Sequence, residues 1–468
     1  MNGALAQILG GALTSLRHAV ESTSGERSHP SDLLALAGRV ERALRERAVA
    51  PNEPVHVRIG NRPSDLGTLL GVWQAGAVAV PIHASAASTT LARVQRVSRA
   101  RFSIDIDQLD VLDQPAPPDR ALLQDAALVI FTSGSTGEPK GVVIAHQRLA
   151  DKLTVLDRLL GVRPNDVVLS PLQLTFIFGL WVSLLTLMTG ARLVLVPKFS
   201  SDAIERALRD ATVLAGVPSM FRTLLADSAP TVAAPKLRLI LTGGEVLAPT
   251  LAHAMQRLAR AAIHDLYGLT ETGSCDFCLG PADQPDGLGT IGHPTDRVTF
   301  RLAQDGRAVA TGETGELQIR TPFGMLGYLD NPELTEAAFD GGYFRTGDLA
   351  RVTERGTVAL VGRSKEMISR GGIKIAPLEI DNLLGEHPGV AAALCAGVPD
   401  ERLGQVIHAV IVPRAGAHLD AAALRDWLLL RTERFKVPEV FHFRDALPSG
   451  SSGKADRRAV AQLAAPAT

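Results

Sequence analysis

The segment Ala127–His146 reads ALVIFTSGSTGEPKGVVIAH: an apolar run, a loop of small and hydroxyl residues, a lysine and a second β-branched run. This pattern predicts a strand, a turn that approaches a ligand closely, and another strand. Glycines let the backbone come near a phosphate, hydroxyl groups donate hydrogen bonds to it, and Lys140 supplies positive charge. Pro139 stands where a Walker A loop has glycine, so we predict a phosphate-binding loop of another kind. An ordinary solvent-exposed loop is the alternative.

Outward from this loop, between about residue 50 and 300, short β-branched runs alternate with amphipathic helical stretches. The alternation predicts an α/β fold with mostly parallel sheets covered by helices. Closely spaced strands with glycine turns follow from Thr299 to Val361 and predict a small antiparallel sheet. After Gly362, the order strand, strand, helix, strand, helix predicts a small α+β unit that ends in a helix near Ala455. We expect a large N-terminal domain, 1–364, and a smaller mobile C-terminal domain, 365–468.

The composition is that of a globular protein: 468 residues, 46% hydrophobic and 21% charged. The formal net charge is −1, so no overall basic field favours nucleic acid or an anionic membrane. We therefore expect no nucleic-acid partner. Three cysteines are too few for a disulfide framework, and the N-terminus resembles an amphipathic helix rather than a signal peptide. These features predict a cytoplasmic protein.

Two features have competing interpretations. Cys275 and Cys278 form a CxxC pair, which is either a redox or half-zinc site or, as we favour, a pair of packed side chains. No charged residue occurs between Val167 and Gly190, which is long enough to span a bilayer. Because Pro171, Gln173 and Gly179 interrupt this stretch, we favour a buried helix and expect no membrane span.

The segment at Ala127 resembles the signature loop of the adenylate-forming superfamily, which contains acyl- and aryl-CoA ligases, adenylation domains and luciferase-like enzymes. Further motifs occur in the family's order over roughly residues 50 to 460. They are YGLTE at Tyr267–Glu271, YFRTGDL at Tyr343–Leu349, GRSKE at Gly362–Glu366, GGIKIAPLEI at Gly371–Ile380 and PSGSSGK at Pro448–Lys454.

The resemblance implies a two-step reaction. A carboxylate attacks the α-phosphate of ATP to form an acyl-adenylate and release pyrophosphate, and the acyl group then passes to a thiol. Cationic groups and Mg²⁺ stabilise the charge that develops on the phosphates. By resemblance, Lys454 bridges the carboxylate and the α-phosphate, and Glu271 holds the metal. Lys454, Thr270 and Glu271 are the candidate catalytic residues.

The resemblance also implies the residues that hold the nucleotide and the thiol cofactor. The phosphate loop contacts the β- and γ-phosphates, Tyr267 lies against adenine, and Asp348 accepts hydrogen bonds from the ribose. The full set of candidate cofactor-binding residues is Thr132, Ser133, Gly134, Ser135, Thr136, Gly137, Lys140, Gly243, Gly244, Glu245, Tyr267, Gly268, Asp348, Arg363, Gly371 and Gly372. ATP, Mg²⁺ and coenzyme A are the expected cofactors.

Lys365 stands where members of this superfamily have a hinge. By resemblance, the small domain rotates about it between two states. One state brings Lys454 to the adenylate, and the other brings the Gly371–Ile375 loop against a pantetheine thiol. A simple linker lysine is the alternative.

The acid pocket is inferred from Phe176 and Phe178, which are similar to the aromatic pair of benzoate-type ligases, with Ala215, Gly216 and Val217 as another wall. Ile177 occupies the position where amino-acid-activating domains carry an aspartate, so α-amino acids are not expected substrates. We expect an aryl or compact apolar acid. Packing in the core is the alternative role for both phenylalanines.

The expected acceptor is coenzyme A, with a separate acyl carrier protein as the alternative. A non-catalytic adenylate-binding protein is disfavoured because the catalytic residue types are present. A luciferase-like oxygenase is disfavoured because Ser369 stands where those enzymes carry a second lysine.

Overall fold

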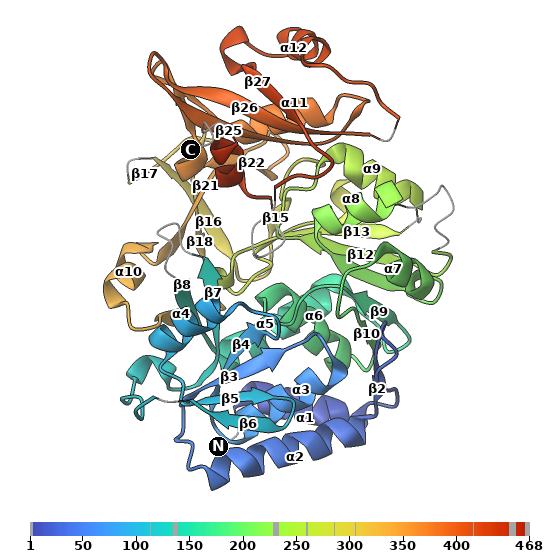
Figure 1. Cartoon of the computed structure of the whole chain (residues 1–468), viewed down its shortest axis with the longest axis vertical. Helices are drawn as coiled ribbons and strands as arrows, with labels where there is room; N and C mark the ends of the chain where they lie inside the picture. The colour runs from blue at the N-terminus through green and yellow to red at the C-terminus, as the bar shows by residue number, and fades with distance from the viewer. Residues whose placement is uncertain are drawn as a thin grey trace.

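The computed structural model describes residues 3–112, 114–133, 139–227, 234–258, 261–284, 286–304, 306–414, 416–448 and 455–463. The chain forms three parts. In Figure 1 the two large sheets with their helices occupy the bottom and the right, the antiparallel sheet lies beside them on the left, and the small C-terminal part is at the top. The predicted α/β fold class is confirmed by this arrangement.

The first large sheet has seven strands in the order β19-β8-β7-β4-β3-β5-β6. Its inner strands β3, β4, β5 and β7 run parallel, whereas β8 returns antiparallel to β7 and places Thr132 opposite Lys140. This β7–β8 hairpin is the strand–loop–strand predicted around the phosphate-loop sequence. The strands are β3 (Pro54–Ile59), β4 (Val78–His83), β5 (Phe102–Asp105), β6 (Gln108–Val111), β7 (Ala126–Ser133), β8 (Pro139–Ala145) and β19 (Gly327–Tyr328).

The second large sheet has nine strands in the order β15-β14-β13-β12-β11-β9-β10-β1-β2, and the six strands from β13 to β1 in this order run parallel. Parallel strands place their carboxyl ends at one edge, where ligands usually bind in such sheets. The strands are β1 (Val20–Ser22), β2 (Arg27–Ser28), β9 (Val167–Ser170), β10 (Arg192–Leu195), β11 (Val213–Gly216), β12 (Leu239–Gly243), β13 (Ala262–Tyr267), β14 (Phe277–Leu279) and β15 (His293–Pro294).

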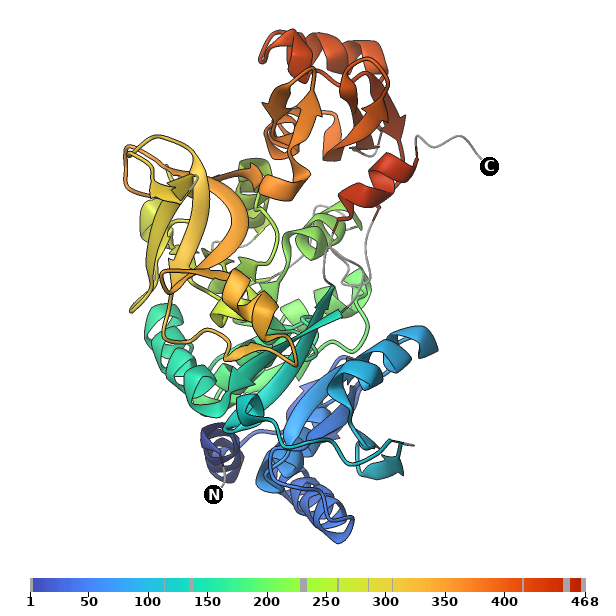
Figure 2. The ribbon, with the colours of Figure 1, turned by 90° about the vertical axis from the view of Figure 1, so that its left-hand side faces the viewer.

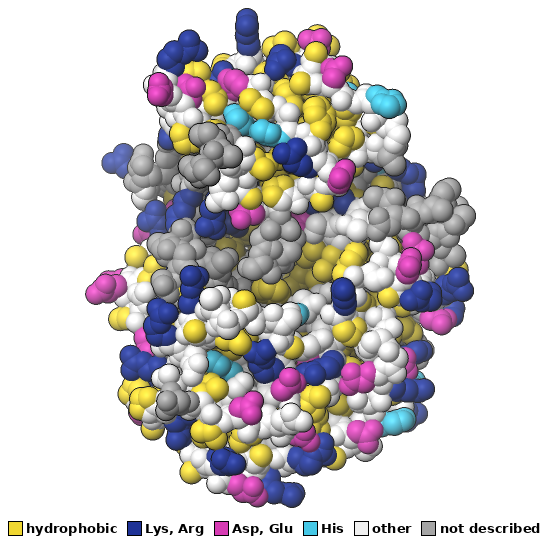
Figure 3. Space-filling view, viewed as in Figure 1, with side chains coloured by type: hydrophobic (Ala, Val, Ile, Leu, Met, Phe, Trp, Pro, Cys, Tyr) yellow, Lys and Arg dark blue, Asp and Glu magenta, His cyan; other side chains and the backbone are white. Residues whose placement is uncertain are grey.

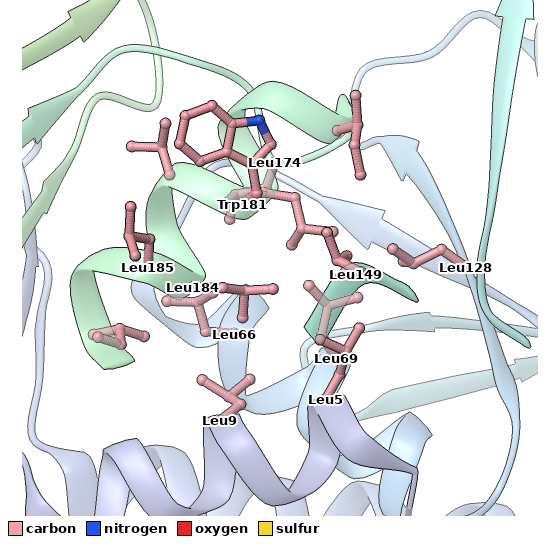
Figure 4. Packing of buried hydrophobic residues seen from close by; sticks show 14 of the residues in the cluster. Leu5, Leu9, Leu66, Leu69, Leu128, Leu149, Leu174, Trp181, Leu184 and Leu185 are labelled. Carbon is pink, nitrogen blue, oxygen red and sulfur yellow. The ribbon is translucent and has the colours of Figure 1, made fainter. Parts of the chain in front are cut away.

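Helices cover both sheets and enclose a leucine-rich core between them. Figure 4 shows Leu5 and Leu9 of the first helix pointing toward Leu66, Leu69, Leu184 and Leu185, with Trp181 at the opposite end of this cluster. The helices are α1 (Ala4–Ser15), α2 (Pro30–Glu46), α3 (Pro63–Gln74), α4 (Ser88–Ser98), α5 (His146–Leu160), α6 (Ile177–Met188), α7 (Ser201–Leu208), α8 (Pro218–Asp227) and α9 (Pro249–Leu258).

The uncharged stretch from Val167 to Gly190 forms β9, a loop and the buried helix α6. The predicted buried helix is therefore confirmed. Among the described residues, no helix combines the length and apolar character that crossing a membrane requires.

The antiparallel sheet predicted from Thr299 onward is also confirmed, with six strands packed on a separate cluster of apolar side chains. It comprises β16 (Thr299–Gln304), β17 (Arg307–Ala308), β18 (Gly315–Arg320), β20 (Phe339–Asp340), β21 (Tyr343–Val352) and β22 (Val358–Arg363), with helix α10 (Pro332–Ala337) nearby.

The C-terminal part has its own five-stranded sheet and its own buried core. Figure 2 shows it standing above the rest of the chain, with α13 at its lower edge. Its elements are β23 (Ile368–Arg370), β24 (Ile373–Ile375), α11 (Pro377–Gly385), β25 (Val390–Asp400), β26 (Gly404–Pro413), α12 (Ala421–Leu429), β27 (Val440–Phe443) and α13 (Arg457–Gln462).

The sequence pattern predicts the helix of this part over Ala421–Phe435, but α12 is shorter. It ends at Leu429 because its buried positions are Leu424 and Leu428 and the next apolar residue, Leu430, is 83% exposed. A longer helix would have had no further apolar surface to cover.

Candidate active site

A large cleft lies where the three parts of the chain meet, and it has a volume of about 1740 Å³. Its walls come from the carboxyl ends of β4, β7, β12 and β13, the start of α6, strands β21 and β22, and one face of the C-terminal part. In Figure 3, hydrophobic side chains are visible inside the hollow between the upper part of the molecule and the rest. A cleft at this edge is the usual ligand site of an α/β sheet.

Tyr267, Asp348 and Arg363 meet on one wall of the cleft. The Tyr267 hydroxyl donates to Asp348 Oδ2 (2.5 Å), and Arg363 Nε donates to Asp348 Oδ1 (2.8 Å). The pairing of β21 with β22 places Asp348 directly opposite Arg363, which explains this geometry. Burial and the Asp348 carboxylate raise the pKa of Tyr267 well above its ordinary value, so the phenol stays protonated as a donor. The structure thus brings Tyr267 into contact with Asp348, which lies 81 positions later in the chain, and with its partner Arg363.

Glu271 lies on a short 3₁₀ turn, η2 (Thr270–Thr272), that follows β13 directly. The Tyr328 hydroxyl donates to Glu271 Oε1 (3.1 Å), and Lys140 Nζ lies 5.4 Å from the centre of the Tyr328 ring. Tyr328 therefore connects the strand after the phosphate loop to the candidate metal ligand. Thr270 and Glu271 both line the cleft.

Mg²⁺ is compatible with this donor set. Among the described residues, no group of three His, Cys, Asp or Glu side chains could form a protein-only metal cage. Magnesium, however, usually keeps several waters and uses one or two carboxylates together with substrate phosphates. The single carboxylate of Glu271 at the cleft wall fits a metal of that kind, held mainly through the nucleotide.

The phosphate loop is only partly within the described chain. Thr132 lines the cleft at the end of β7, and Lys140 lies beside it on β8. The Ser133 side chain and Gly134, Ser135, Thr136 and Gly137 lie outside the described residues, as does Lys454.

The turn after β12 contributes Gly244 and Glu245 to the cleft, whereas Gly243 packs beneath it. A Cβ atom at Gly243 would lie 2.2 Å from the Leu266 carbonyl oxygen, so the strands approach too closely for any side chain. Glu245 accepts hydrogen bonds from the Ser219 backbone nitrogen (3.0 Å) and hydroxyl (2.8 Å), which holds the turn against the start of α8. Gly268 also lines the cleft next to Tyr267.

Aromatic side chains at the start of α6 form the opposite wall. Phe176 is 40% exposed, and the Phe178 ring lies 5.2 Å from the buried ring of Trp181. Ile177 lines the same wall and is apolar where an aspartate would be needed for an ammonium group. The wall is therefore suited to an apolar or aromatic group.

The wall predicted at Ala215, Gly216 and Val217 lines the cleft through Val217 alone of these three residues. Ala215 is fully buried in β11, and the space above Gly216 is filled by the Phe221 ring, 3.0 Å from where a Cβ would be. Val217 follows β11 directly and faces the cleft. Ala215 and Gly216 are the last two residues of β11 and lie inside the sheet, so the chain reaches the cleft only after the strand ends.

The loop before α6 is held by Asn61, which is fully buried. Its side-chain amide donates to the carbonyls of Leu172 (3.1 Å) and Val196 (3.0 Å), and its oxygen accepts from the Leu174 nitrogen (2.9 Å). These hydrogen bonds link the two large sheets beside the wall formed by Phe176 and Phe178. They therefore hold in place the loop that precedes these aromatic residues.

The C-terminal part faces the cleft with the segments on either side of Lys454. Leu447, Ala455 and Arg457 line the cleft, whereas Gly371 and Gly372 lie on an exposed turn between β23 and β24. Arg457 is bound to Glu366 Oε2 (2.9 Å), Asp381 Oδ2 (2.6 Å) and the Cys395 carbonyl (2.7 Å). These contacts fix the start of α13 to the residue that follows Lys365.

The cysteines favour the packing interpretation. Cys275, Cys278 and Cys395 are free and buried, and burial raises the pKa of the Cys275 thiol to about 12. A thiol that does not ionise is neither a good nucleophile nor a good metal ligand. Asp265, another buried group at the cleft, has its pKa raised to about 7 by burial.

Tyr328, Trp181 and Ser274 are among the residues of this site that the sequence did not predict. The Trp181 indole nitrogen donates to Ser274 Oγ (3.3 Å), and both residues line the cleft. The chain has only three tyrosines and three tryptophans, and this scarcity is the one signal that could have drawn attention to Tyr328 and Trp181.

Comparison with known proteins agrees with this geometry. Residues 17–329 match the family model of AMP-binding enzymes, and residues 379–454 match that of the AMP-binding enzyme C-terminal domain. A feruloyl-CoA synthase of an Amycolatopsis species is 32% identical over 450 residues, which cover 91% of each chain. An indoleacetate–CoA ligase of Aromatoleum aromaticum is 32% identical over 474 residues, which cover 92% of each chain.

Among solved structures, ATP-bound MatB from Rhodopseudomonas palustris superposes with a TM-score of 0.88 at 26% identity, covering 99% of each chain. The predicted membership of the adenylate-forming superfamily is confirmed. The chain belongs to the AMP-binding enzyme family.

Proposed function

We propose that this chain activates an aryl or compact apolar carboxylic acid with ATP and transfers the acyl group to coenzyme A. The wall formed by Phe176, Phe178 and Trp181 supports an aryl or compact apolar acid as the substrate. It faces the Tyr267–Asp348–Arg363 cluster across the cleft. The general reaction is that of an AMP-forming acid–CoA ligase, the enzyme class to which the named relatives belong.

In the first step, an oxygen of the substrate carboxylate forms a bond to the α-phosphorus of ATP, and the bond to pyrophosphate breaks. Asp348 is suited to accept hydrogen bonds from the ribose, and Tyr267 to hold the adenosine against the cleft wall. Glu271 would hold Mg²⁺, which neutralises charge on the phosphates when bound. Lys140 and Lys454 are assigned to the phosphates and to the reacting carboxylate.

In the second step, the thiolate of coenzyme A attacks the acyl carbon and AMP leaves. We assign this step to a second arrangement in which Gly371 and Gly372 face the cleft. The present arrangement supports the first step, because the residues that flank Lys454 line the cleft while that turn is exposed. A boundary between domains 1–364 and 365–468 fits this rotation, since η4 (Ser364–Glu366) separates the two sheets.

The acid class follows from the wall chemistry. Two or three aromatic rings bury a flat apolar group favourably, and the apolar Ile177 offers no partner for an ammonium. We place the protein in the cytoplasm because a chain with three free, buried cysteines does not depend on an oxidising compartment.

The test is a panel of benzoates, cinnamates, arylacetates, short dicarboxylates and C6–C12 fatty acids, with pyrophosphate release measured with and without coenzyme A. We expect aryl acids to give the highest kcat/KM, with turnover only when coenzyme A is present. Phe178→Ala should reduce kcat/KM for aryl acids more than for fatty acids. A preference for dicarboxylates would refute the proposal that the substrate is an aryl or compact apolar acid. Turnover that requires an acyl carrier protein would show that the carrier protein, and not coenzyme A, is the acceptor.

A further inference from the structure

The segment that follows Glu271 contains a strained turn. Gly273, Ser274 and Cys275 have φ values of 85°, 67° and 50° in succession, a left-handed conformation that residues with a Cβ atom rarely adopt. Such a conformation persists only where surrounding contacts fix it. We call residues 273–275 the left-handed turn.

Backbone contacts tie the left-handed turn to the nucleotide side of the cleft. The Ser274 nitrogen donates to the Leu269 carbonyl (2.8 Å), and the Asp276 nitrogen donates to the Tyr267 carbonyl (2.7 Å). Gly268 lies directly against the turn, since a Cβ there would be 2.4 Å from the Cys275 nitrogen. A shift of the turn would therefore displace the whole Tyr267–Glu271 segment.

The same turn forms part of the acid side of the cleft. Ser274 lines the cleft, and its hydroxyl accepts the Trp181 indole hydrogen bond. Trp181 in turn packs on the leucine-rich core (Figure 4), and its ring lies 5.2 Å from that of Phe178. The left-handed turn is thus shared between the wall that holds the nucleotide and the wall that contacts the acid.

A buried lysine reaches this turn from a distant helix. Lys152 of α5 is 0% exposed, and its Nζ donates to the Cys275 carbonyl (2.7 Å). The same Nζ lies 3.9 Å from Asp276 Oδ1 and 5.0 Å from the centre of the Phe323 ring. Asp276 is also 0% exposed, and its other oxygen accepts from the Thr272 hydroxyl.

Burying an ammonium and a carboxylate is costly unless each has partners. The chain has eight lysines and forty arginines, and among the lysines of the described residues Lys152 is the one that is completely buried. Removing either member of the pair would leave the other charge unpaired beside the active-site turn. Without Lys152, the Cys275 carbonyl would keep the hydrogen bond from the Thr295 hydroxyl (3.0 Å).

We propose that Lys152 is a positioning residue that fixes the left-handed turn and thereby sets the distance between Glu271 and the acid wall at Ser274. Lys152 does not line the cleft itself, so its effect passes through Cys275 and Asp276. The roles of Glu271 and Ser274 in this inference rest on the proposed function, whereas the anchoring of the turn does not.

The test compares Lys152→Met with the wild-type protein by hydrogen exchange and by kinetics. We expect the Ser274 and Asp276 amides to exchange at least about tenfold faster, while β12 amides are unchanged. We also expect kcat/KM to fall roughly 10- to 100-fold, the size of effect seen when a supporting partner of a ligating group is lost. The ratio of kcat/KM between two aryl acids of different size should change as well.

Lys152→Met/Asp276→Leu separates positioning from stability. Replacing both charges with apolar groups restores much of the melting temperature, and Thr272 keeps its bond to the Leu269 carbonyl. The Cys275 carbonyl still lacks the hydrogen bond from the lysine. The faster amide exchange at Ser274 and Asp276 and the altered ratio of kcat/KM between the two aryl acids should therefore remain. This double variant decides the question if the single variant does not fold.

Two controls complete the design. Lys236→Met removes an exposed lysine paired with Asp210 and should leave exchange and kinetics unchanged. Val40→Ala opens a cavity where α2 packs against Gly71 of α3 and should lower the melting temperature without altering the ratio of kcat/KM between the two acids. The proposal is overturned if Lys152→Met keeps wild-type exchange at Ser274 and Asp276, or if Val40→Ala reproduces its acid ratio. Absence of acid-dependent pyrophosphate release in the wild type would refute the proposed function instead, and the exchange data would still decide the anchoring.

Discussion

Asp348→Asn tests the nucleotide side of the site. Asp348 is 4% exposed and its two oxygens accept from Tyr267 and Arg363. Asparagine has nearly the same shape but carries no charge and replaces one acceptor oxygen with a donor amide. The substitution therefore changes hydrogen bonding while leaving packing intact.

The expected loss of stability follows from the two hydrogen bonds that Asp348 accepts. Arg363 has a side chain that is 59% exposed, so its ion pair contributes at most about 1 kcal/mol after solvent screening. The bond from the buried Tyr267 hydroxyl changes from charge-assisted to neutral or is lost, which costs about 1–2 kcal/mol. We expect the melting temperature to fall by roughly 2–8 °C.

Binding of ATP should suffer more than stability. Losing one charge-assisted hydrogen bond to the ribose costs about 1.5–3 kcal/mol, which raises the KM for ATP by about 10- to 150-fold. The KM for the acid should change little. Pyrophosphate release at varied ATP concentration measures this effect.

The control is Asp340→Asn on the neighbouring strand β20. Asp340 is paired with Arg301 at 2.7 Å, but both side chains are about a third exposed, so kinetics and melting temperature should stay near the wild type. A KM for ATP within threefold of the wild-type value in a folded Asp348→Asn protein would refute the ribose-binding role.

The remaining predictions concern the two half-reactions and the pH dependence of stability. Lys454→Ala should lower adenylate formation about 10²- to 10³-fold yet leave thioester formation from a supplied acyl-adenylate nearly intact, and equal loss of both would contradict the role of Lys454. Lys365→Pro should do the reverse, because proline restricts the backbone at the proposed hinge; full thioester formation by this variant would argue against rotation there. Burial lowers the pKa of His146 to about 4, below the unfolded value near 6.5, so its contribution to stability is present above about pH 6.5 and is lost as the pH falls toward 4. His146→Phe should therefore lose less stability than the wild type between pH 6.5 and 4.5, as measured by urea unfolding, and identical pH profiles would contradict this.

Local patterns predicted most of the fold. The β-branched runs and helical periodicities between residues 50 and 300 correspond to the two large sheets, because burial of each face follows directly from those periods. Boundaries were less accurate where burial stops without a local signal, as at Leu429 in α12. Of the wall predicted at Ala215, Gly216 and Val217, the cleft is lined by Val217, because the first two residues still belong to β11.

The site was predictable where its residues belong to short motifs and not where they meet through tertiary contacts. Tyr267, Glu271 and Asp348 are marked by their motifs, and the structure places them on one cleft. Lys152 and Cys275 are 123 positions apart, and nothing local to α5 indicates that its lysine points inward to a turn. Tyr328 reaches Glu271 across 57 positions in the same way.

The central claim is that the substrate carboxylate attacks the α-phosphate of ATP. An aryl acid labelled with ¹⁸O in its carboxylate, incubated with ATP, Mg²⁺ and coenzyme A, tests this directly by mass spectrometry of the nucleotide product. The proposed reaction predicts AMP that carries one ¹⁸O atom, together with unlabelled pyrophosphate. Unlabelled AMP, or ADP formed with labelled phosphate, would contradict it.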